Sequence, residues 1–236
     1  MLLYVIRHGD PDYEHDTLTP LGHRQAEAVA KRLAVNGLTR IYSSPAGRAI
    51  ATAKPTSEIL QLPIQIEDWC EEGLTWRDFH GKLSDGSDSF IFFEQNTKVK
   101  TEESMQYTND NWYELDCFKT INGKEGYKRI QTHLDDFLAR QGYVREGVKY
   151  RIERPNDYRV ALFCHQGFGM VLLSVLLQIP PQYMFASFDI PHTGMSIFHF
   201  RNNADGWTMP RCLTLSDISF LYEDRLPLLY NYSVKI

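Results

Sequence analysis

Two long apolar runs limit the folds that this chain can adopt. Residues 2–6 (LLYVI) and residues 160–164 (VALFC) contain no charged side chain, and polar sequence follows each run directly. Continuous apolar runs of this kind are typical of strands that are covered on both faces, as at the centre of a parallel sheet. Helical periodicity then appears in residues 18–37 and residues 168–178. The alternation predicts an α/β protein, in the form of a three-layer α/β/α sandwich with a mainly parallel sheet.

Residues 18–37 (LTPLGHRQAEAVAKRLAVNG) carry start and stop signals for a helix. Thr19 is the expected N-cap, because its side-chain oxygen can accept a hydrogen bond from a free backbone N–H of the first turn. Pro20 suits the first helical position, where no N–H donor is needed, and Gly37 suits the C-terminal stop.

A second strand and helix are expected directly afterwards. Residues 39–44 (TRIYSS) read as a short strand, and Ser44 is the expected cap of the helix that follows. Pro55 is expected to kink or end that helix, because a proline inside a helix lacks the N–H donor and clashes with the preceding turn. Further along the chain, the pattern predicts a helix over residues 126–142 and a strand over residues 194–200.

The stretch from about residue 76 to residue 120 interrupts this pattern. It is polar and rich in turn residues, yet it contains several aromatic side chains, Trp76 and Trp112 among them. A loop of this length is uncommon unless it has a function of its own. Since 236 residues of which 43% are hydrophobic can bury a full core, we expect one domain over residues 1–236 with a cap insertion at about 76–120.

The charge distribution argues against several classes of partner. The formal net charge is −5 without long runs of like charge, so neither nucleic-acid binding nor polybasic attachment to a membrane is expected. No apolar stretch reaches the length of a membrane span, and the start of the chain lacks the basic region of a signal peptide. Four cysteines lie far apart without a CxxC pair. These observations predict a cytoplasmic protein with reduced thiols.

Charged and nucleophilic side chains follow three of the expected strands. The first strand ends at Arg7 and His8, the second is followed by Arg48 in the next helix, and the run at 160–164 is followed by His165. Ligands bind at the carboxyl ends of the strands in open parallel sheets, so these side chains are expected to converge. Arginine forks match phosphate oxygens, and a neutral imidazole can attack phosphorus. The arrangement predicts a site for a phosphoryl group.

Each of these residues also has a structural interpretation when it is taken alone. Arg7 and His8 could form an exposed strand end, Arg48 could be a solvated helix residue, and His165 could be a hydrogen-bonded core histidine. A metal site built from histidines and Cys164 is a further alternative, but the chain has neither an HExxH motif nor paired cysteines. We therefore expect no metal and no other cofactor.

Four segments support the phosphoryl site when they are read together. In chain order they are RHG (7–9), LTPLGHRQA (18–26), IYSSPAGRAIATA (41–53) and ALFCHQG (161–167). Their order and approximate spacing resemble the histidine phosphatase superfamily, the phosphoglycerate mutase-like proteins. The resemblance covers most of the chain except the insertion and the C-terminal tail. It implies that His8 is the nucleophile, that Arg7 and Arg48 grip the phosphate, and that His165 is the second histidine of the site.

The resemblance also implies a catalytic acid. The family carries it in a segment of the form L-x-E, which falls on Glu71 at the end of residues 69–71 (WCE). Trp69 stands in place of the usual leucine, and Glu72 is a close competitor for the role.

Two further phosphate contacts are implied in the same way. The second histidine of the family is commonly followed by a glycine, whereas Gln166 stands between His165 and Gly167 here and is expected to contact the substrate. Residues 191–197 (PHTGMSI) resemble a segment whose small polar residue approaches the phosphate, which implies a contact from Thr193.

The expected function is the hydrolysis of a phosphorylated small molecule through a phosphohistidine at His8. One alternative is phosphoryl transfer of the phosphoglycerate mutase type, although residues 10–17 (DPDYEHDT) lack the tryptophan–asparagine pair that follows RHG in those mutases. The other is a non-catalytic module that binds a phosphorylated ligand, although binding alone would not need a nucleophile. The tail at residues 221–236 is expected to pack on the body of the domain, and a contact in a homodimer is the alternative for it.

Overall fold

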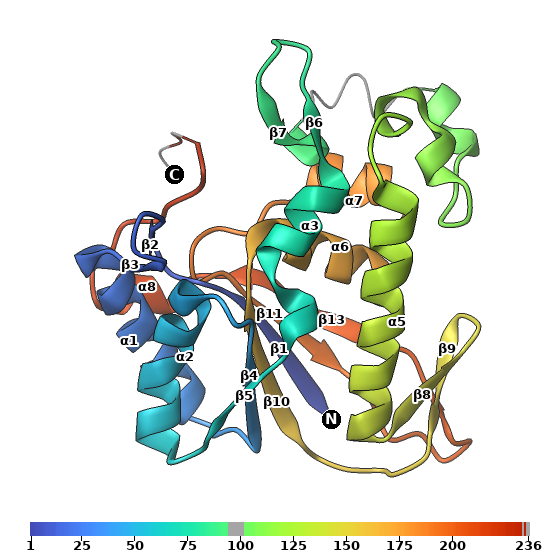
Figure 1. The fold of residues 1–236 in the computed structure, drawn as a ribbon. Coiled ribbons are helices and arrows are strands. Elements are labelled where there is room, and N and C mark those ends of the chain that lie inside the picture. Colours follow the sequence, from blue (N-terminus) through green and yellow to red (C-terminus); the bar gives the residue numbers. More distant parts are fainter. Residues whose placement is uncertain (94–101, 233, 235–236) are drawn as a thin grey trace.

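A six-stranded sheet runs through the centre of the computed structural model, which describes residues 1–93, 102–232 and 234 (Figure 1). The strand order is β13-β11-β1-β10-β4-β5. The parallel strands are β1 (Leu2–Arg7), β10 (Arg159–Cys164), β4 (Arg40–Ser43) and β5 (Ile64–Ile66). At the other edge the antiparallel strands are β11 (Met195–His199) and β13 (Arg211–Asp217). The predicted α/β class with a mainly parallel sheet is confirmed.

The two apolar runs form the middle of this sheet. β1 lies between β10 and β11, and all its residues but the first are buried. β10 pairs with β1 on one side and with β4 on the other, and it is buried to the same extent. Successive residues of β1 contact different layers, because strand side chains point to opposite faces. Leu3 and Val5 join one hydrophobic cluster, whereas Tyr4 and Ile6 join the other.

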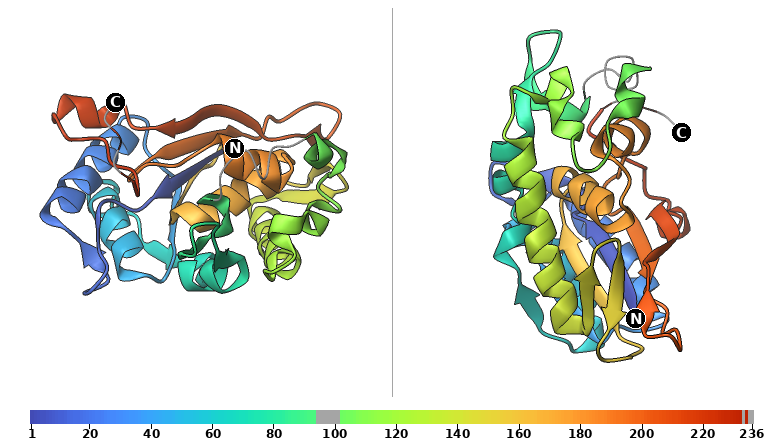
Figure 2. Two further views of the ribbon diagram at one scale, coloured as in Figure 1. Left: turned by 90° about the horizontal axis from the view of Figure 1, so that it is seen from above. Right: turned by 90° about the vertical axis from the view of Figure 1, so that its right-hand side faces the viewer.

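Helices cover both faces of the sheet, as can be followed in Figure 2. The cluster that holds Tyr4 and Ile6 is completed by α1 (Pro20–Ala34), α2 (Gly47–Leu60) and α8 (Phe220–Glu223). The opposite cluster is completed by α3 (Glu72–Phe79), α5 (Gly123–Gln141), α6 (Gln166–Leu177) and α7 (Pro181–Ser187). The structure therefore has three layers, with the sheet between two helical layers.

The start of α1 follows the signals in the sequence. Thr19 is the N-cap, and its Oγ1 accepts a hydrogen bond from the backbone N–H of Gly22 at 3.1 Å. Pro20 occupies the first helical position. The helix ends at Ala34, and Gly37 follows in the left-handed conformation with φ of 69°.

The course of α2 differs from the expectation in two ways. Its N-cap is Ala46 rather than Ser44, whose Oγ instead accepts a hydrogen bond from the backbone N–H of Ala46. Pro55 neither ends nor divides the helix, which continues to Leu60. Buried Thr52, Ala53 and Thr56 on either side of the proline hold α2 in place, so tertiary packing outweighs the loss of one N–H donor.

The interrupted stretch lies at the upper end of the molecule in Figure 1. Its expected beginning at residue 76 falls inside α3, which the sequence analysis did not predict. After α3 the described part of the stretch forms a hairpin and four short 3₁₀ turns. These are β6 (His80–Lys82), β7 (Asp88–Phe90), η2 (Ile91–Phe93), η3 (Glu103–Gln106), η4 (Trp112–Glu114) and η5 (Asp116–Phe118).

Aromatic packing holds this cap together. Trp112 is 1% exposed, and its ring centroid lies 5.1 Å from that of Phe118 and 6.3 Å from that of Phe79 in α3. Part of the aromatic content of the insertion is thus buried, and it belongs to the hydrophobic cluster that holds Leu3 and Val5.

The remaining elements are short. They are β2 (Pro11–Asp12), β3 (Thr17–Leu18), η1 (Asp68–Cys70), β8 (Tyr143–Glu146), β9 (Lys149–Ile152) and β12 (Trp207–Thr208). Within the described ranges, none of the helices combines the length and the apolar character that a bilayer crossing requires.

A buried ion pair joins α3 to α5. The Asp78 carboxylate is 1% exposed and accepts hydrogen bonds from Arg129 Nε at 3.1 Å and Arg129 Nη2 at 3.0 Å. Arg77 Nε donates to the same carboxylate at 2.8 Å. Burial tends to raise the pKa of Asp78, but the hydrogen bonds from Arg77 and Arg129 outweigh it and leave this pKa below its ordinary value.

We expect Asp78→Ala to lower the free energy of unfolding by ~3 kcal/mol, because it leaves the partly buried guanidinium of Arg129 without its carboxylate partner. The folded-state pKa is depressed, so this stability is present above the ordinary carboxyl pKa of ~4 and is lost as the pH falls below it. Urea unfolding at pH 7 and pH 3 measures both effects. Asp88→Ala, which removes an exposed carboxylate paired with Lys82, is the matched control and should change little. A cost of Asp78→Ala that grows at pH 3 would contradict this account.

Candidate active site

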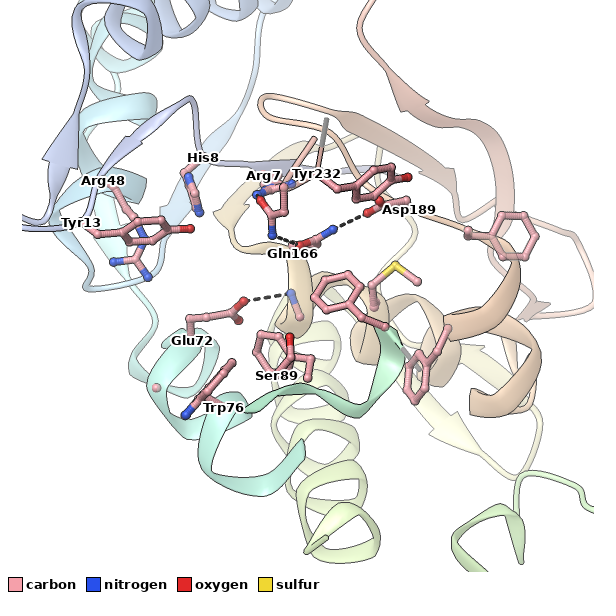
Figure 3. A pocket seen from close by; sticks show the side chains of 18 of the residues that line it. Arg7, His8, Tyr13, Arg48, Glu72, Trp76, Ser89, Gln166, Asp189 and Tyr232 are labelled. Carbon is pink, nitrogen blue, oxygen red and sulfur yellow. Dashed lines mark hydrogen bonds between the residues drawn. The ribbon is translucent and has the colours of Figure 1, made fainter. Parts of the chain in front are cut away.

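The carboxyl ends of β1, β4 and β10 open into a cavity of about 1050 Å³. Arg7, His8 and Arg48, which were predicted from the strand ends, line it together with Gln166, whereas His165 is not among the lining residues. Figure 3 shows these side chains directed toward a common space, with Glu72 of α3 on the opposite wall. The parallel sheet thus brings together residues that lie far apart in the sequence.

His8 is held in a form suited to nucleophilic attack. Its Nδ1 lies 2.7 Å from the carbonyl oxygen of Gly9. Since a carbonyl only accepts, Nδ1 carries the proton and Nε2 keeps its lone pair. Burial, then the neighbouring His165, then Arg7 hold the pKa of His8 well below its ordinary value. The imidazole is therefore neutral at physiological pH.

His165 lies directly beside His8. It is the N-cap residue of α6, its Nε2 shares a 2.7 Å hydrogen bond with Ser44 Oγ, and its ring centroid is 5.2 Å from that of His8. Burial, followed by Arg48 and Arg7, lowers the pKa of His165 well below its ordinary value. Its Nδ1 is buried without a hydrogen-bond partner among the described residues.

Two arginines supply the positive charge of the pocket. Arg7 is 1% exposed, and it donates from Nη1 to the carbonyl of Ile190 at 2.6 Å and from Nη2 to Asn231 Oδ1. Burial lowers the pKa of Arg7 to about 10, so it stays charged at neutral pH. Arg48, in the first turn of α2, donates from Nη1 to Asp16 Oδ1 at 2.5 Å. The Nε atoms of both arginines are buried without a partner in the described part of the chain.

The structure favours Glu72 over Glu71 as the carboxyl group of the site, which corrects the expected assignment. Both side chains are among those that line the cavity, but their carboxylates accept hydrogen bonds from different elements. Glu71 is the N-cap of α3, and its carboxylate accepts from the backbone N–H groups of Gly73 at 2.9 Å and Leu74 at 3.2 Å. A carboxylate committed to a helix cap is poorly placed to move protons.

Glu72 points across the cavity to the start of α6. Its carboxylate accepts from the backbone N–H groups of Gly167 and Phe168, each at 2.9 Å. Burial raises the pKa of Glu72 to about 7, although these hydrogen bonds and the charges of Arg7 and Arg48 act in the opposite direction. A carboxyl group with such a pKa can both donate and accept a proton near neutral pH.

The two further expected contacts have different outcomes. Gln166 lines the cavity, where its Nε2 donates to Asp189 Oδ1 and its Oε1 accepts from Asn231 Nδ2. Thr193 is buried outside the cavity lining, and its hydroxyl donates to the carbonyl of His192 at 2.6 Å. Its backbone N–H donates to the carbonyl of His8 at 3.1 Å. Thr193 therefore supports the loop that carries His8 and does not itself face the pocket, contrary to the expectation.

The sequence analysis missed two residues of this region. Asn231, from the C-terminal tail, bridges Arg7 and Gln166 and lines the cavity. His192 is buried with its ring centroid 5.9 Å from that of His8, and burial and Arg7 lower its pKa to about 3. The motif PHTG contained a signal for His192, whereas no local pattern singled out Asn231.

The arrangement of the side chains bears on whether the protein could hold a metal ion. Over residues 1–93, 102–232 and 234, no three His, Cys, Asp or Glu side chains are grouped as a metal site requires. The positive charge of the pocket comes from Arg7 and Arg48.

Comparison with known proteins gives matches of sequence and of fold. Residues 3–115 match the family model of the histidine phosphatase superfamily (branch 1). A putative phosphoserine phosphatase 2 from Hydrogenobacter thermophilus is 29% identical over 121 residues, which are 44% of this chain but only 59% of that protein's own length. A probable phosphoglycerate mutase from Yersinia enterocolitica is 25% identical over 188 residues, or 76% of each protein.

One solved structure with the same fold is the phosphoserine phosphatase of Entamoeba histolytica in complex with 3-phosphoglyceric acid. It superposes with a TM-score of 0.61 at 18% identity, over 93% of this chain and 98% of that one. At this level of identity the likeness concerns the fold.

The Asn231 bridge generates a prediction about anion binding. Asn231→Ala removes the acceptor of one Arg7 donor and the donor to Gln166. We expect the affinity for inorganic phosphate to fall about tenfold, since a hydrogen bond to a charged group is worth at least that much. Titration calorimetry measures the change. Asn202→Ala, which removes a hydrogen bond to Tyr143, is the matched control and should leave phosphate binding intact. Unchanged phosphate affinity in Asn231→Ala would show that the bridge does not position Arg7.

Proposed function

Because the chain belongs to the histidine phosphatase superfamily, we propose that it is a phosphomonoesterase that acts on a phosphorylated small molecule through a phosphohistidine at His8. The observation that carries this proposal is the neutral His8 ring, which is held by Gly9, lies beside His165 and lines one cavity with Arg7 and Arg48. A neutral imidazole is a nucleophile for phosphorus, and fixed positive charges stabilise the transferring phosphoryl group.

The proposed reaction has two steps on one phosphorus atom. In the first, the lone pair of His8 Nε2 forms a bond to phosphorus while the ester P–O bond breaks, and protonated Glu72 gives its proton to the leaving oxygen. Arg7 and Arg48 stabilise the charge on the equatorial oxygens. In the second, ionised Glu72 takes a proton from water as the water oxygen attacks phosphorus. The P–N bond then breaks, which releases phosphate and restores neutral His8 and protonated Glu72.

Hydrolysis is favoured over transfer to a second substrate hydroxyl by the access of water. A mutase holds its phosphohistidine in a closed site. Here Trp76 is 40% exposed and Phe188 is 39% exposed at the cavity lining, so solvent reaches this space. A binding module without catalysis would need neither a neutral imidazole nor a carboxyl group with a pKa of about 7.

The nucleophile is tested by His8→Ala. We expect turnover of 4-nitrophenyl phosphate to fall by at least ~10³, since the covalent step is lost while the fold survives. Rapid quench with labelled substrate should trap an acid-labile, alkali-stable adduct in the wild type alone, and phosphate release should match substrate loss. His23→Ala, on the exposed face of α1, is the control. A His8→Ala protein with normal turnover would refute the mechanism, and faster isomerisation of 3-phosphoglycerate than phosphate release would favour the mutase alternative.

The acid is tested by comparing Glu72→Gln with Glu71→Gln. Loss of a general acid costs ~10²–10⁴ in rate where the leaving group needs a proton. Glu72→Gln should therefore slow an alkyl phosphate far more than 4-nitrophenyl phosphate, whereas Glu71→Gln should leave the ratio near that of the wild type.

The pH profile gives a second measure of the same role. Only protonated Glu72 can donate, so kcat/KM for the alkyl ester should fall as the pH rises through about 7, the raised pKa of Glu72. This descent should be absent in Glu72→Gln. A descent that persists there, or equal losses for both esters, would assign the acid to another group.

A further inference from the structure

The positive charge of the cavity is confined to one end. Among the described lining residues the basic side chains are Arg7 and Arg48, and both lie at the end where His8 would receive the phosphoryl group. A phosphate monoester carries up to two negative charges near neutral pH, which these two arginines match. The described lining therefore offers no further cation to a second anionic group on the substrate.

The other end of the cavity carries a carboxylate. Asp189 lies beyond Gln166 as seen from His8 in Figure 3, and its Oδ1 accepts from Gln166 Nε2 and from the backbone N–H of Ile190. Tyr232 bonds to the same carboxylate, and burial together with Asp189 raises the pKa of Tyr232. All these partners are neutral, and Asp189 forms no ion pair with a described side chain. Arg7 attracts Asp189 only at longer range, and no described cation pairs with the carboxylate directly, so a cationic group of a ligand can do so.

Aromatic rings also line the cavity. Trp76, Phe93 and Phe188 line the cavity and are 40%, 38% and 39% exposed, respectively. Phe90 packs edge-on against Trp76 with ring centroids 4.9 Å apart, which fixes the Trp76 indole. Exposed aromatic faces in a concave site bind apolar or aromatic groups, and they also attract cations.

We propose that the substrate is the monophosphate of an alcohol or phenol with an apolar or aromatic body, and that it presents an ammonium group to Asp189. This inference rests on the proposed phosphatase activity and adds the chemical class of the leaving group. Asp189 acts as a specificity-determining residue, because it attracts a cation and repels a carboxylate at the same position. Substrates of the phosphoglycerate type, whose carboxylate would have no described cationic partner, are disfavoured by the same charges.

Three aryl phosphates test the charge preference with the chemistry held constant. They carry a para chain that ends in an ammonium group (O-phosphotyramine), a methyl group (4-ethylphenyl phosphate) or a carboxylate (3-(4-phosphonooxyphenyl)propionate). Their phenol leaving groups are nearly equivalent, so differences in kcat/KM report binding of the chain. We expect O-phosphotyramine to exceed the carboxylate ester by at least about tenfold, since one gains an ion pair and the other meets a like charge.

Asp189→Asn tests the assignment to one side chain. The amide keeps the shape and the acceptor oxygen but removes the charge, so the ratio of kcat/KM for the ammonium and carboxylate esters should approach one. Asp136→Asn, on the exposed face of α5, is the matched control and should keep the ratio of the wild type. Thermal unfolding of each variant shows that the fold is intact.

The outcomes separate the inference from the proposed function. If the wild type hydrolyses none of the three esters and no 4-nitrophenyl phosphate, the phosphatase proposal itself fails. If it hydrolyses the esters but prefers the carboxylate, or if Asp189→Asn leaves the ratio unchanged, the inference fails while the phosphatase proposal stands. A loss of the preference in Asp189→Asn alone supports the inference.

Discussion

The burial of one guanidinium is the constraint on which the site depends. Arg7 ends the central strand of the sheet and is almost inaccessible to solvent. A guanidinium cannot give up its proton to reduce the cost of burial. Its closest described partners are the neutral oxygens of Ile190 and Asn231, while the carboxylates of Glu72 and Asp189 act on it through longer-range attraction. A charge that is buried but only partly compensated favours an anionic ligand.

Burial keeps the histidines around Arg7 neutral, and the charge of Arg7 adds to this effect. His8, His165 and His192 are all buried, and Arg7 contributes to the lowered pKa of each. Neutral rings are what a nucleophile needs before a phosphate arrives. When a phosphate dianion enters, its charge would favour the protonated form of His165, which could then donate to it. The pocket thus combines two permanent cations with imidazoles whose charge responds to the ligand.

The sequence predicted the fold and the site correctly where several local features agreed. The apolar runs predicted the central strands, and Thr19 and Pro20 predicted the start of α1. The strand ends predicted that Arg7, His8 and Arg48 line one cavity and that His165 lies beside His8. Signals that depend on tertiary packing were missed. Pro55 stays inside α2 because its neighbours are buried, and α3 was hidden in a stretch of irregular periodicity.

A second limit of the sequence is that it could not decide between neighbouring residues for one role. Glu71 and Glu72 are adjacent and chemically identical, and only the direction of each side chain separates a helix cap from a pocket wall. The contact of Asn231 with Arg7 joins distant parts of the chain, which no local pattern encodes.

The position of β1 has a further consequence, for the order of folding. This first strand pairs with β10 and β11, which are synthesised far later, so Leu3 meets Val160 and Phe198 only when most of the chain is available. Such non-local pairing slows folding and leaves an apolar strand uncovered until its neighbours have been synthesised.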